Sequence, residues 1–273
     1  MQGFRRNWPI CWTGAPDGKA GHGGQEPDRT GPTAGREVRP VSLPLVLVGC
    51  PVRNRARVLP AYLSALEAMD YPPGRLRFAF VLNDSVDESE AILRAFAERR
   101  PTALLRRDLG FPRWRRGHYS YANLALLRNL LIEEALRSGA DYLFSVDSDV
   151  LPPPHALRRL LAAARPIVGA RVPNDLHLPG EHWRCNFLCA DDRGRLRHPR
   201  SFPPDALMPV DVVGAAVLIA RAVLEAGCRY APAGTGEDEG FCRQAKAAGF
   251  QPWVDTGVVC RHLMQEGDGG PEG

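Results

Sequence analysis

Long apolar runs are missing from this chain of 273 residues. No stretch approaches the roughly 18 consecutive apolar residues that a membrane-spanning helix needs, so the sequence argues against such a helix. The N-terminal region carries charges but lacks the continuous apolar segment of a secretory signal. We therefore expect a cytoplasmic protein, with peripheral contact to a membrane surface as the alternative.

Lysine is almost absent, because Lys19 and Lys246 are the only lysines among 35 basic residues. The guanidinium group of arginine matches phosphate and carboxylate groups, so an arginine-rich surface favours anionic ligands. Base composition of the gene explains the bias equally well, since Ala, Gly and Pro are also abundant. The formal net charge is only +4. No nucleic-acid-binding motif surrounds the basic residues, and we do not expect a nucleic-acid partner.

Paired cysteine spacing is also missing. The seven cysteines are scattered, their number is odd, and none forms a Cys-x-x-Cys pair. This pattern argues against a disulfide framework and against a structural zinc site.

The composition divides the chain into three parts. Residues 1–40 are rich in Gly, Pro and polar residues without periodicity, and we expect a disordered leader. Residues 41–264 alternate short apolar runs with segments of helical periodicity, which is typical of one α/β domain. Residues 265–273 are Gly-rich and are expected to form a flexible tail.

The alternation predicts a mostly parallel central sheet flanked by helices. Strands are expected at 45–50, 78–82, 103–105, 142–146, 166–170, 210–219, 253–255 and 257–262. Helices are expected near 58–69, 86–100, 121–137, 155–164 and 241–248. Residues 171–209 show little periodicity and are expected to form a long functional loop.

Two carboxylates follow one of the predicted strands. Asp147-Ser148-Asp149 comes directly after the apolar run 142–146. Ligands of open α/β sheets bind beyond the carboxyl ends of strands. Residues two apart on an extended segment point to the same side, so Asp147 and Asp149 would converge on one cation. Oxygen ligands of this kind suit Mg²⁺ or Mn²⁺, although an acidic turn that caps the next helix is the alternative.

Further polar residues follow other predicted elements. Asn83-Asp84 ends the second strand, the acidic run 237–239 begins a helix after a glycine turn, and His262 ends the last strand. Parallel strands present their carboxyl ends at one edge of a sheet, so these groups outline a nucleotide-sugar site together with Asp147 and Asp149.

At this point the chain resembles the GT-A glycosyltransferases, generally the inverting transferases of family 2, over residues 43–262. The resemblance rests on Pro51-Val52-Arg53-Asn54, Asn83-Asp84, Asp147-Ser148-Asp149, Gly236-Glu237-Asp238-Glu239 and Arg261-His262. It is closer still to the glycosyltransferase domain of procollagen galactosyltransferases and related bacterial proteins. That likeness is carried by the Arg-Asn and Leu-Pro-x-Tyr-Leu pattern in 53–63, by Asp70-Tyr71-Pro72, and by Gly139-Ala140-Asp141-Tyr142. It implies a single-domain, Rossmann-like GT-A fold.

The resemblance implies a donor site for a UDP-sugar. Asp84 looks like the residue that accepts from the uracil N–H, with an Asx turn or helix N-cap as the alternative. Pro51 and Arg53 would line the base pocket. Arg128 matches a position that approaches the nucleotide, and a surface salt bridge is the alternative. Gly214-Ala215 would let the backbone pass close to the donor sugar, or would serve only strand packing.

The resemblance also implies a metal site and a base. Asp147 would meet the ribose or the metal, Asp149 would bind Mn²⁺ or Mg²⁺ directly, and His262 looks like the third ligand unless it is merely structural. Asp238 is the expected general base, with Glu237 or Glu239 as alternates. Acidic residues at a helix N-terminus also have a purely electrostatic explanation.

The expected reaction is metal-dependent, inverting transfer of a sugar from a UDP-sugar to a hydroxyl of a glycan, lipid or protein. Residues 171–209 and the basic-aromatic segment 113–118 are candidates for acceptor contacts. A nucleotidyltransferase is one rival, but such enzymes usually carry a Gly-rich loop after the first strand, and 51–54 contains no Gly. A catalytically silent nucleotide-sugar-binding module is the second rival.

Overall fold

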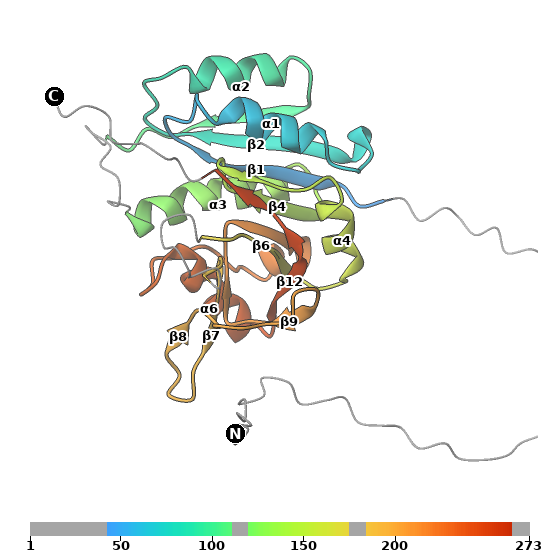
Figure 1. Ribbon diagram of the computed structural model, residues 1–273. Coiled ribbons are helices and arrows are strands. Elements are labelled where there is room, and N and C mark those ends of the chain that lie inside the picture. Colours follow the sequence, from blue (N-terminus) through green and yellow to red (C-terminus); the bar gives the residue numbers. More distant parts are fainter. Residues whose placement is uncertain (1–42, 111–119, 175–183, 264–273) are drawn as a thin grey trace, which may run out of the picture. The chain divides into compact units, whose positions relative to one another are not determined.

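The computed structural model describes residues 43–110, 120–174 and 184–263 (Figure 1). The expected leader at 1–40, the expected tail at 265–273 and the basic-aromatic segment 113–118 lie outside the described residues. From Pro44 onward the described residues belong to one compact unit.

A mixed sheet with a parallel half forms the centre of this unit. Its strand order is β3-β2-β1-β4-β11-β6-β12-β9. The strands are β1 (Val46–Val52), β2 (Leu76–Leu82), β3 (Thr102–Arg106), β4 (Tyr142–Val146), β6 (Ile167–Arg171), β9 (Leu207–Pro209), β11 (Ala216–Ala220) and β12 (Pro252–Val259). β3, β2, β1 and β4 are parallel neighbours, and so are β6 and β12, whereas β11 and β9 run antiparallel to the strands beside them. The expected mostly parallel sheet is confirmed.

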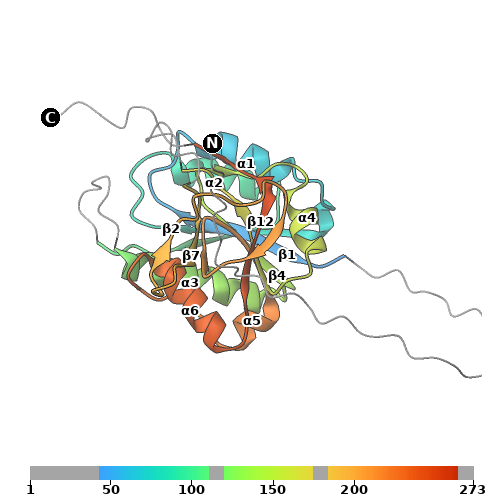
Figure 2. The ribbon, with the colours of Figure 1, turned by 60° about the horizontal axis from the view of Figure 1, so that its bottom comes forward.

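Helices cover both faces of the sheet (Figure 2). They are α1 (Leu59–Glu67), α2 (Ser89–Ala97), α3 (Tyr121–Arg137), α4 (Ala156–Ala162), α5 (Arg221–Glu225) and α6 (Glu237–Ala247), with a short 3₁₀ helix at Pro73–Arg75. Alternate residues of β1 point to opposite faces. Val46 and Val48 pack in the core cluster that includes α1, α2 and α4. Leu47 packs in the cluster that includes α3, α5 and α6. The expected α/β fold with a flanked sheet is therefore present.

A three-stranded sheet and a two-stranded sheet complete the described fold. β7 (Phe187–Ala190) lies between β10 (Val212–Val213) and β8 (Leu196–Arg197) in a three-stranded sheet. β5 (Val150–Leu151) pairs antiparallel with β13 (Arg261–His262). Both small sheets are separate from the main sheet. The second joins the segment after β4 to the segment after β12.

Three expectations about elements are wrong. The described part of 171–209 contains β7, β8 and β9 rather than only loop, because short strands carry little periodicity. The predicted strand at 210–219 is broken into β10 and β11 at Gly214-Ala215, where Ala215 has a φ of 61°. The two predicted strands between 253 and 262 divide at Cys260, because β12 runs on to Val259.

In the described part of the chain, none of the helices combines the length and apolar character needed to cross a membrane.

Candidate active site

The candidate site begins at the carboxyl end of β4. From β1 the chain adds β2 and then β3 on one side of the sheet, and it adds β4 on the other side of β1. The order of the strands therefore changes direction between β1 and β4. Such a switch point is where open α/β sheets bind ligands. The backbone N–H of Asp147 donates to the carbonyl of Ala215 over 2.8 Å, which fixes the residue that leaves the strand. Tyr62 supports the same strand end, because its hydroxyl donates to the carbonyl of Val146 over 2.8 Å.

Asp147-Ser148-Asp149 forms a turn, in which the N–H of Val150 donates to the carbonyl of Asp147 over 2.9 Å. The expectation of an extended segment at this point is wrong. The two carboxylates consequently meet different partners: Asp147 accepts from Arg128, and Asp149 lies beside Arg55 and His262.

The β5–β13 pair brings His262 to Asp149. β5 starts directly after Asp149, and His262 is paired with Val150. The N–H of Leu263 donates to the carbonyl of Asp149 over 2.7 Å. His262 Nε2 lies 3.8 Å from Asp149 Oδ1, while its Nδ1 lies 3.2 Å from Asn174 Oδ1. Two of the three predicted metal ligands are therefore neighbours.

Asp149 is flanked by a cation from the loop after β1. Arg55 Nη2 lies 3.4 Å from Asp149 Oδ2. Burial raises the pKa of Asp149, and the nearby charges of Arg55 and His262 oppose that shift while Asp147 adds to it. A carboxylate whose negative charge is disfavoured by burial gains stability from a bound cation.

The described residues contain no group of three His, Cys, Asp or Glu side chains placed to hold a metal ion. Asp149 and His262 nevertheless offer an oxygen and a nitrogen from adjacent segments, with Asp147 close enough for its charge to act on Asp149. Mg²⁺ and Mn²⁺ usually take only one or two carboxylates from the protein and complete their shell with water and substrate phosphates. The residues present thus fit a divalent cation whose remaining ligands are water and the oxygens of a diphosphate.

Arg128 of α3 is the buried centre of the site. Its side chain is 7% exposed and donates to Glu237 over 2.9 Å, to Ser145 over 3.1 Å and to Asp147 over 2.7 Å. Ser145 lies in β4 and Asp147 directly follows the strand, two residues further on, which is why one guanidinium reaches both. The surface salt bridge considered for Arg128 is wrong, and the residue instead joins β4 to α6.

Asp238 lies in the first turn of α6, immediately after the carboxylate that Arg128 binds. Burial raises the pKa of Asp238 to about 7; the guanidinium of Arg128 opposes this shift, and the carboxylates of Glu237 and Asp147 add to it. The residue is half-buried. A Cβ on Gly214 would overlap the Asp238 carboxylate, so a larger residue there would displace that carboxylate. A carboxylate with a pKa near neutrality suits general-base chemistry.

The two alternates for the base are already engaged. Glu237 is 7% exposed and forms its ion pair with Arg128. Glu239 accepts from the backbone N–H of Thr235 over 2.7 Å and from its hydroxyl over 2.9 Å. These contacts stabilise the turn that leads into α6, so Asp238 is the better placed of the three acids.

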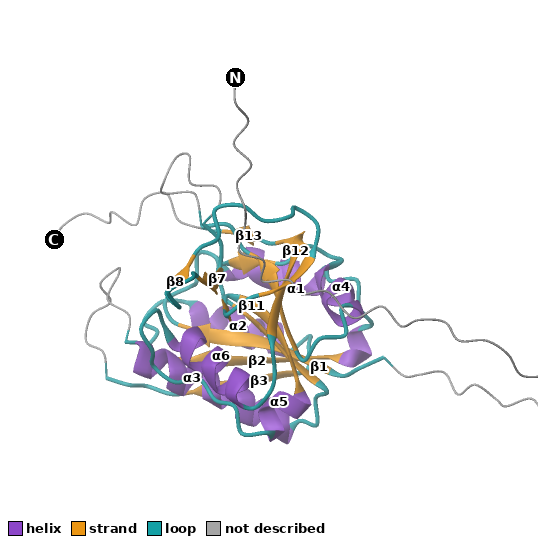
Figure 3. Cartoon of the chain, turned by 90° about the horizontal axis from the view of Figure 1, so that it is seen from below, coloured by secondary structure: helices purple, strands orange, loops and turns teal. Residues whose placement is uncertain are grey.

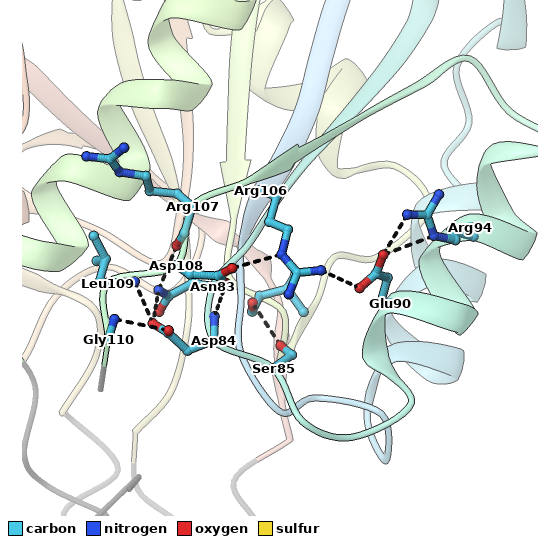
Figure 4. A network of polar contacts seen from close by, with 11 residues as sticks. Asn83, Asp84, Ser85, Glu90, Arg94, Arg106, Arg107, Asp108, Leu109 and Gly110 are labelled. Atoms are coloured by element: carbon cyan, nitrogen blue, oxygen red, sulfur yellow. Dashed lines mark hydrogen bonds and ion pairs between the residues drawn. The ribbon is translucent and has the colours of Figure 1, made fainter. Parts of the chain in front are cut away.

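Asp84 lies at the end of β2 with a φ of 44° and holds the loop after β3 (Figure 4). Its carboxylate accepts from Asn83 Nδ2 over 2.7 Å and from the backbone N–H groups of Leu109 and Gly110 over 2.9 and 3.1 Å. Its own N–H donates to Asp108 over 3.1 Å. These contacts join Asp84 to a loop that follows it by 25 residues, so they are neither the Asx turn nor the helix N-cap considered as the alternative. A carboxylate has about four lone-pair sites, so base recognition stays a prediction.

The remaining predicted donor residues lie at the same edge. Pro51 lies near the carboxyl end of β1, where it is paired with Val81 of β2. Arg53 follows in the loop after β1. Asn186 clamps the small-residue step, because its amide donates to the carbonyl of Gly214 over 2.6 Å and to that of Ala170 over 2.9 Å. Asn186 belongs to the segment 171–209, which the sequence predicts to contact the acceptor, and its side-chain amide holds the backbone at Gly214 and Ala170.

Four contributors escaped the sequence analysis. They are Arg55, Ser145, Asn174 and Tyr230. The Arg128 guanidinium lies 5.5 Å from the centre of the Tyr230 ring, a cation–π arrangement between residues 102 positions apart. Arg55 had a signal, since it lies in the loop that the Arg53 motif marks. The other three are ordinary core or loop residues by sequence.

Comparison with known proteins decides the family. The model of the glycosyltransferase family 25 N-terminal domain matches residues 43–190, which is more than half of the chain. The chain belongs to glycosyltransferase family 25. The predicted likeness to the procollagen galactosyltransferase domain is confirmed.

Family 25 relatives match only part of their own length. A glycosyltransferase 25 family member of Anopheles gambiae is 31% identical over 49% of this chain and 24% of its own. Procollagen galactosyltransferase 2 of Homo sapiens is 29% identical over 47% of this chain and 22% of its own. A probable inactive glycosyltransferase 25 family member 3 of Bos taurus is 30% identical over 54% and 26%. The chain thus spans about a quarter of the length of these relatives.

Solved structures show that this family 25 chain has the GT-A fold. S. aureus TarS 1–349 in complex with UDP-GlcNAc has a TM-score of 0.56 at 14% identity, covering 82% of this chain and 59% of TarS. The mannosyltransferase PcManGT from Pyrobaculum calidifontis, in complex with GDP-Man and Mn²⁺, has a TM-score of 0.55 at 19% identity, covering 84% and 59%. At these identities the likeness shows the fold alone.

Proposed function

We propose that this family 25 chain transfers a sugar from a UDP-sugar to a hydroxyl group of a glycan, lipid or protein, with inversion and with Mn²⁺ or Mg²⁺. The observation that carries the proposal is Asp238, a half-buried residue whose carboxyl pKa burial raises to about 7. Its neighbour Glu237 is joined to Asp147 through Arg128. This arrangement joins a base to the carboxylates at the end of β4.

In the proposed reaction Asp238 accepts the proton of the acceptor hydroxyl. The hydroxyl oxygen forms its bond to the anomeric carbon as the bond from that carbon to the diphosphate oxygen breaks, and UDP leaves. A divalent cation, when bound, neutralises the negative charge that develops on the diphosphate. Asp149 and His262 would hold it, with Asp147 beside them. Arg128 keeps Asp147 and the first turn of α6 in fixed relation to each other.

The GT-A neighbours support a nucleoside-diphosphate sugar as donor, since TarS binds UDP-GlcNAc and PcManGT binds GDP-Man with Mn²⁺. The procollagen galactosyltransferase relatives support a hydroxyl acceptor, and a protein is one of the candidates. Family membership does not favour the nucleotidyltransferase alternative.

A catalytically silent donor-binding module is the second candidate, because relatives of family 25 include proteins named inactive. The Asp238→Asn variant separates the two. Release of UDP from UDP-galactose, UDP-glucose and UDP-GlcNAc is measured with Mn²⁺ and a panel of hydroxyl acceptors, and UDP affinity is measured by calorimetry.

An enzyme loses about 10²- to 10⁴-fold of its turnover in Asp238→Asn while UDP affinity stays unchanged. The exposed Asp192→Asn serves as the matched control. Turnover equal to that of the unaltered protein in Asp238→Asn would remove the base assignment. Absence of turnover in the unaltered protein, with UDP bound, would favour the silent module.

A further inference from the structure

β12 carries extra residues opposite β6. Asp255 is paired with Ala170 and Val259 with Arg171, and these partners are consecutive in β6. Residues 256–258 of β12 are therefore bulged out of the pairing. A bulge in a strand bends the strand and can re-aim the side chains that follow it.

The bulge reverses the side-chain alternation of the strand, because three is an odd number. Before it, Val254 packs in the core cluster that includes α3, α5 and α6. Val258, the last bulged residue, and Cys260 beyond it pack in the opposite cluster, which includes α1, α2 and α4. The alternation continues beyond the strand: Cys260 is buried, Arg261 is exposed, and His262 is half-buried beside Asp149.

Without the reversal, the side chains of Val259 and Arg261 would point in the direction in which those of Val258, Cys260 and His262 now point. Arg261, a fixed cation, would then take the place of His262 against Asp149. An arginine cannot ligate a metal ion, whereas a neutral imidazole can. The bulge thus decides whether this end of the site offers a ligand or a competing charge.

An ion-pair cluster holds the bulge. Asp255 is 6% exposed and accepts from Arg159 of α4 through both oxygens, over 2.7 and 2.8 Å. The same carboxylate accepts from the backbone N–H of Gly257 over 3.0 Å. Arg159 also binds Asp205. α4 lies beside β12 (Figure 3), so the clamp joins a helix of the outer layer to the irregular part of the strand.

Two residues of the bulge fit this clamp closely. A Cβ on Gly257 would overlap Arg159 and Asp205. Thr256 is fully buried; its hydroxyl donates to the carbonyl of Pro203 over 2.6 Å and accepts from the N–H of Ala206 over 2.9 Å. The bulged backbone is therefore held on one side by Arg159 and on the other by the segment before β9.

We propose that Arg159 and Asp255 are positioning residues for the cation site: by fixing the bulge at 256–258, they make His262 face Asp149. The inference rests on the proposed function, because it takes His262 as a cation ligand. Neither Arg159 nor Asp255 touches the reacting groups, and both act through the register of 260–263.

The test uses Arg159→Met in the full chain, with Arg158→Met as the matched control, because Arg158 makes an exposed pair with Asp70. Binding of Mn²⁺ alone and with UDP is titrated by electron paramagnetic resonance. Arg159→Met is expected to weaken Mn²⁺ binding by about tenfold or more, the effect typical of groups that orient metal ligands. In a His262→Ala background the same change is expected to have no further effect.

Hydrogen–deuterium exchange in metal-free protein provides an independent readout. Amides of 258–263 are expected to exchange faster in Arg159→Met, while β1 and β4 stay protected. If Arg159→Met does not fold, Gly257→Ala replaces it, with Gly74→Ala as control because a Cβ there meets nothing. Unchanged Mn²⁺ affinity, or an equal loss in the His262→Ala background, overturns the proposal.

Failure of the proposed function gives a different result. If the unaltered protein binds no Mn²⁺ with or without UDP, the metal-dependent reaction fails, and with it the cation-site role of Arg159 and Asp255. Faster exchange confined to 258–263 in Arg159→Met then still shows that Arg159 fixes the bulge, and unchanged exchange there contradicts that as well.

Discussion

At the scale of single residues, Asp238, the proposed base, and its environment are the most informative feature. Burial and two carboxylates raise the pKa of Asp238 to about 7, and Arg128 opposes them. A base acts only when deprotonated, so its raised pKa moves the acidic limit of activity up to neutral pH.

The pH profile of kcat tests this assignment. Turnover is expected to be constant above about pH 8 and to fall below pH 7, by about tenfold per pH unit, as Asp238 is protonated. The affinity of the protein for UDP, measured at pH 6 and pH 8, serves as the control for donor binding. A profile that stays flat from pH 8 to pH 5 would contradict the assignment.

Arg128 is expected to be the costliest charge in the site to remove. Its 7% exposed guanidinium satisfies Glu237 and Asp147, so Arg128→Met leaves two carboxylates without their cation. We expect the free energy of unfolding to fall by about 3–5 kcal/mol, measured by urea denaturation.

Arg94→Met is the control for that variant, because Arg94 pairs with Glu90 on the exposed surface of α2 and is expected to cost less than about 1 kcal/mol. Equal losses in the two variants would show that Arg128 does not hold the site together.

At the scale of elements, the contact between the break of the β10–β11 segment and α6 sets the position of the base. Gly214 lies between β10 and β11, and a Cβ there would overlap the Asp238 carboxylate. Gly214→Ala is expected to displace that carboxylate and to lower kcat by about 10²-fold, the order that a misplacement of about 1 Å costs. Gly74→Ala is the control, and kcat is measured at saturating UDP-sugar.

Gly214→Ala with the kcat of the unaltered protein would show that the base has room to move, or that Asp238 is not the base. The affinity of Gly214→Ala for UDP is expected to stay within about twofold of that of the unaltered protein, since the added methyl group would meet Asp238 of α6.

The elements also show what the sequence could and could not predict. α3 and β4 begin and end at the predicted residues, because an apolar stripe defines the helix and a continuous apolar run followed by Asp147 defines the strand. The break at Gly214-Ala215 was missed, because these residues are as apolar as a strand. The bulge of β12 was missed because its cause is Arg159, 96 positions away from Asp255.

The candidate site shows the same division. The sequence predicted Asp147, Asp149, Asp238 and His262 as site residues, since each follows a strand or begins a helix at the edge where the strands end. The long-range partners Tyr230 and Ser145 were not found, because side chains that meet across the fold leave no local pattern. A turn at 147–149 was considered only as the alternative to an extended segment, although the turn decides which partner each carboxylate meets.

At the scale of the whole molecule, the fold gathers the proposed donor site and the proposed base around one buried arginine, Arg128. β1, β2 and β4 present Arg55, Asp84 and Asp149 along the ligand-binding edge, and α6 presents Asp238. The chain belongs to glycosyltransferase family 25 and has the GT-A fold. The central claim is that this edge binds UDP together with a divalent cation.

Calorimetric titration of UDP, with and without Mn²⁺, tests that claim most directly, with GDP and CDP as competitors and Asp149→Ala as the variant. We expect UDP to bind more tightly than GDP or CDP, to need Mn²⁺, and to lose most of its affinity in Asp149→Ala. UDP affinity that is indifferent to Mn²⁺ and to Asp149, or no nucleotide binding at all, would contradict the account.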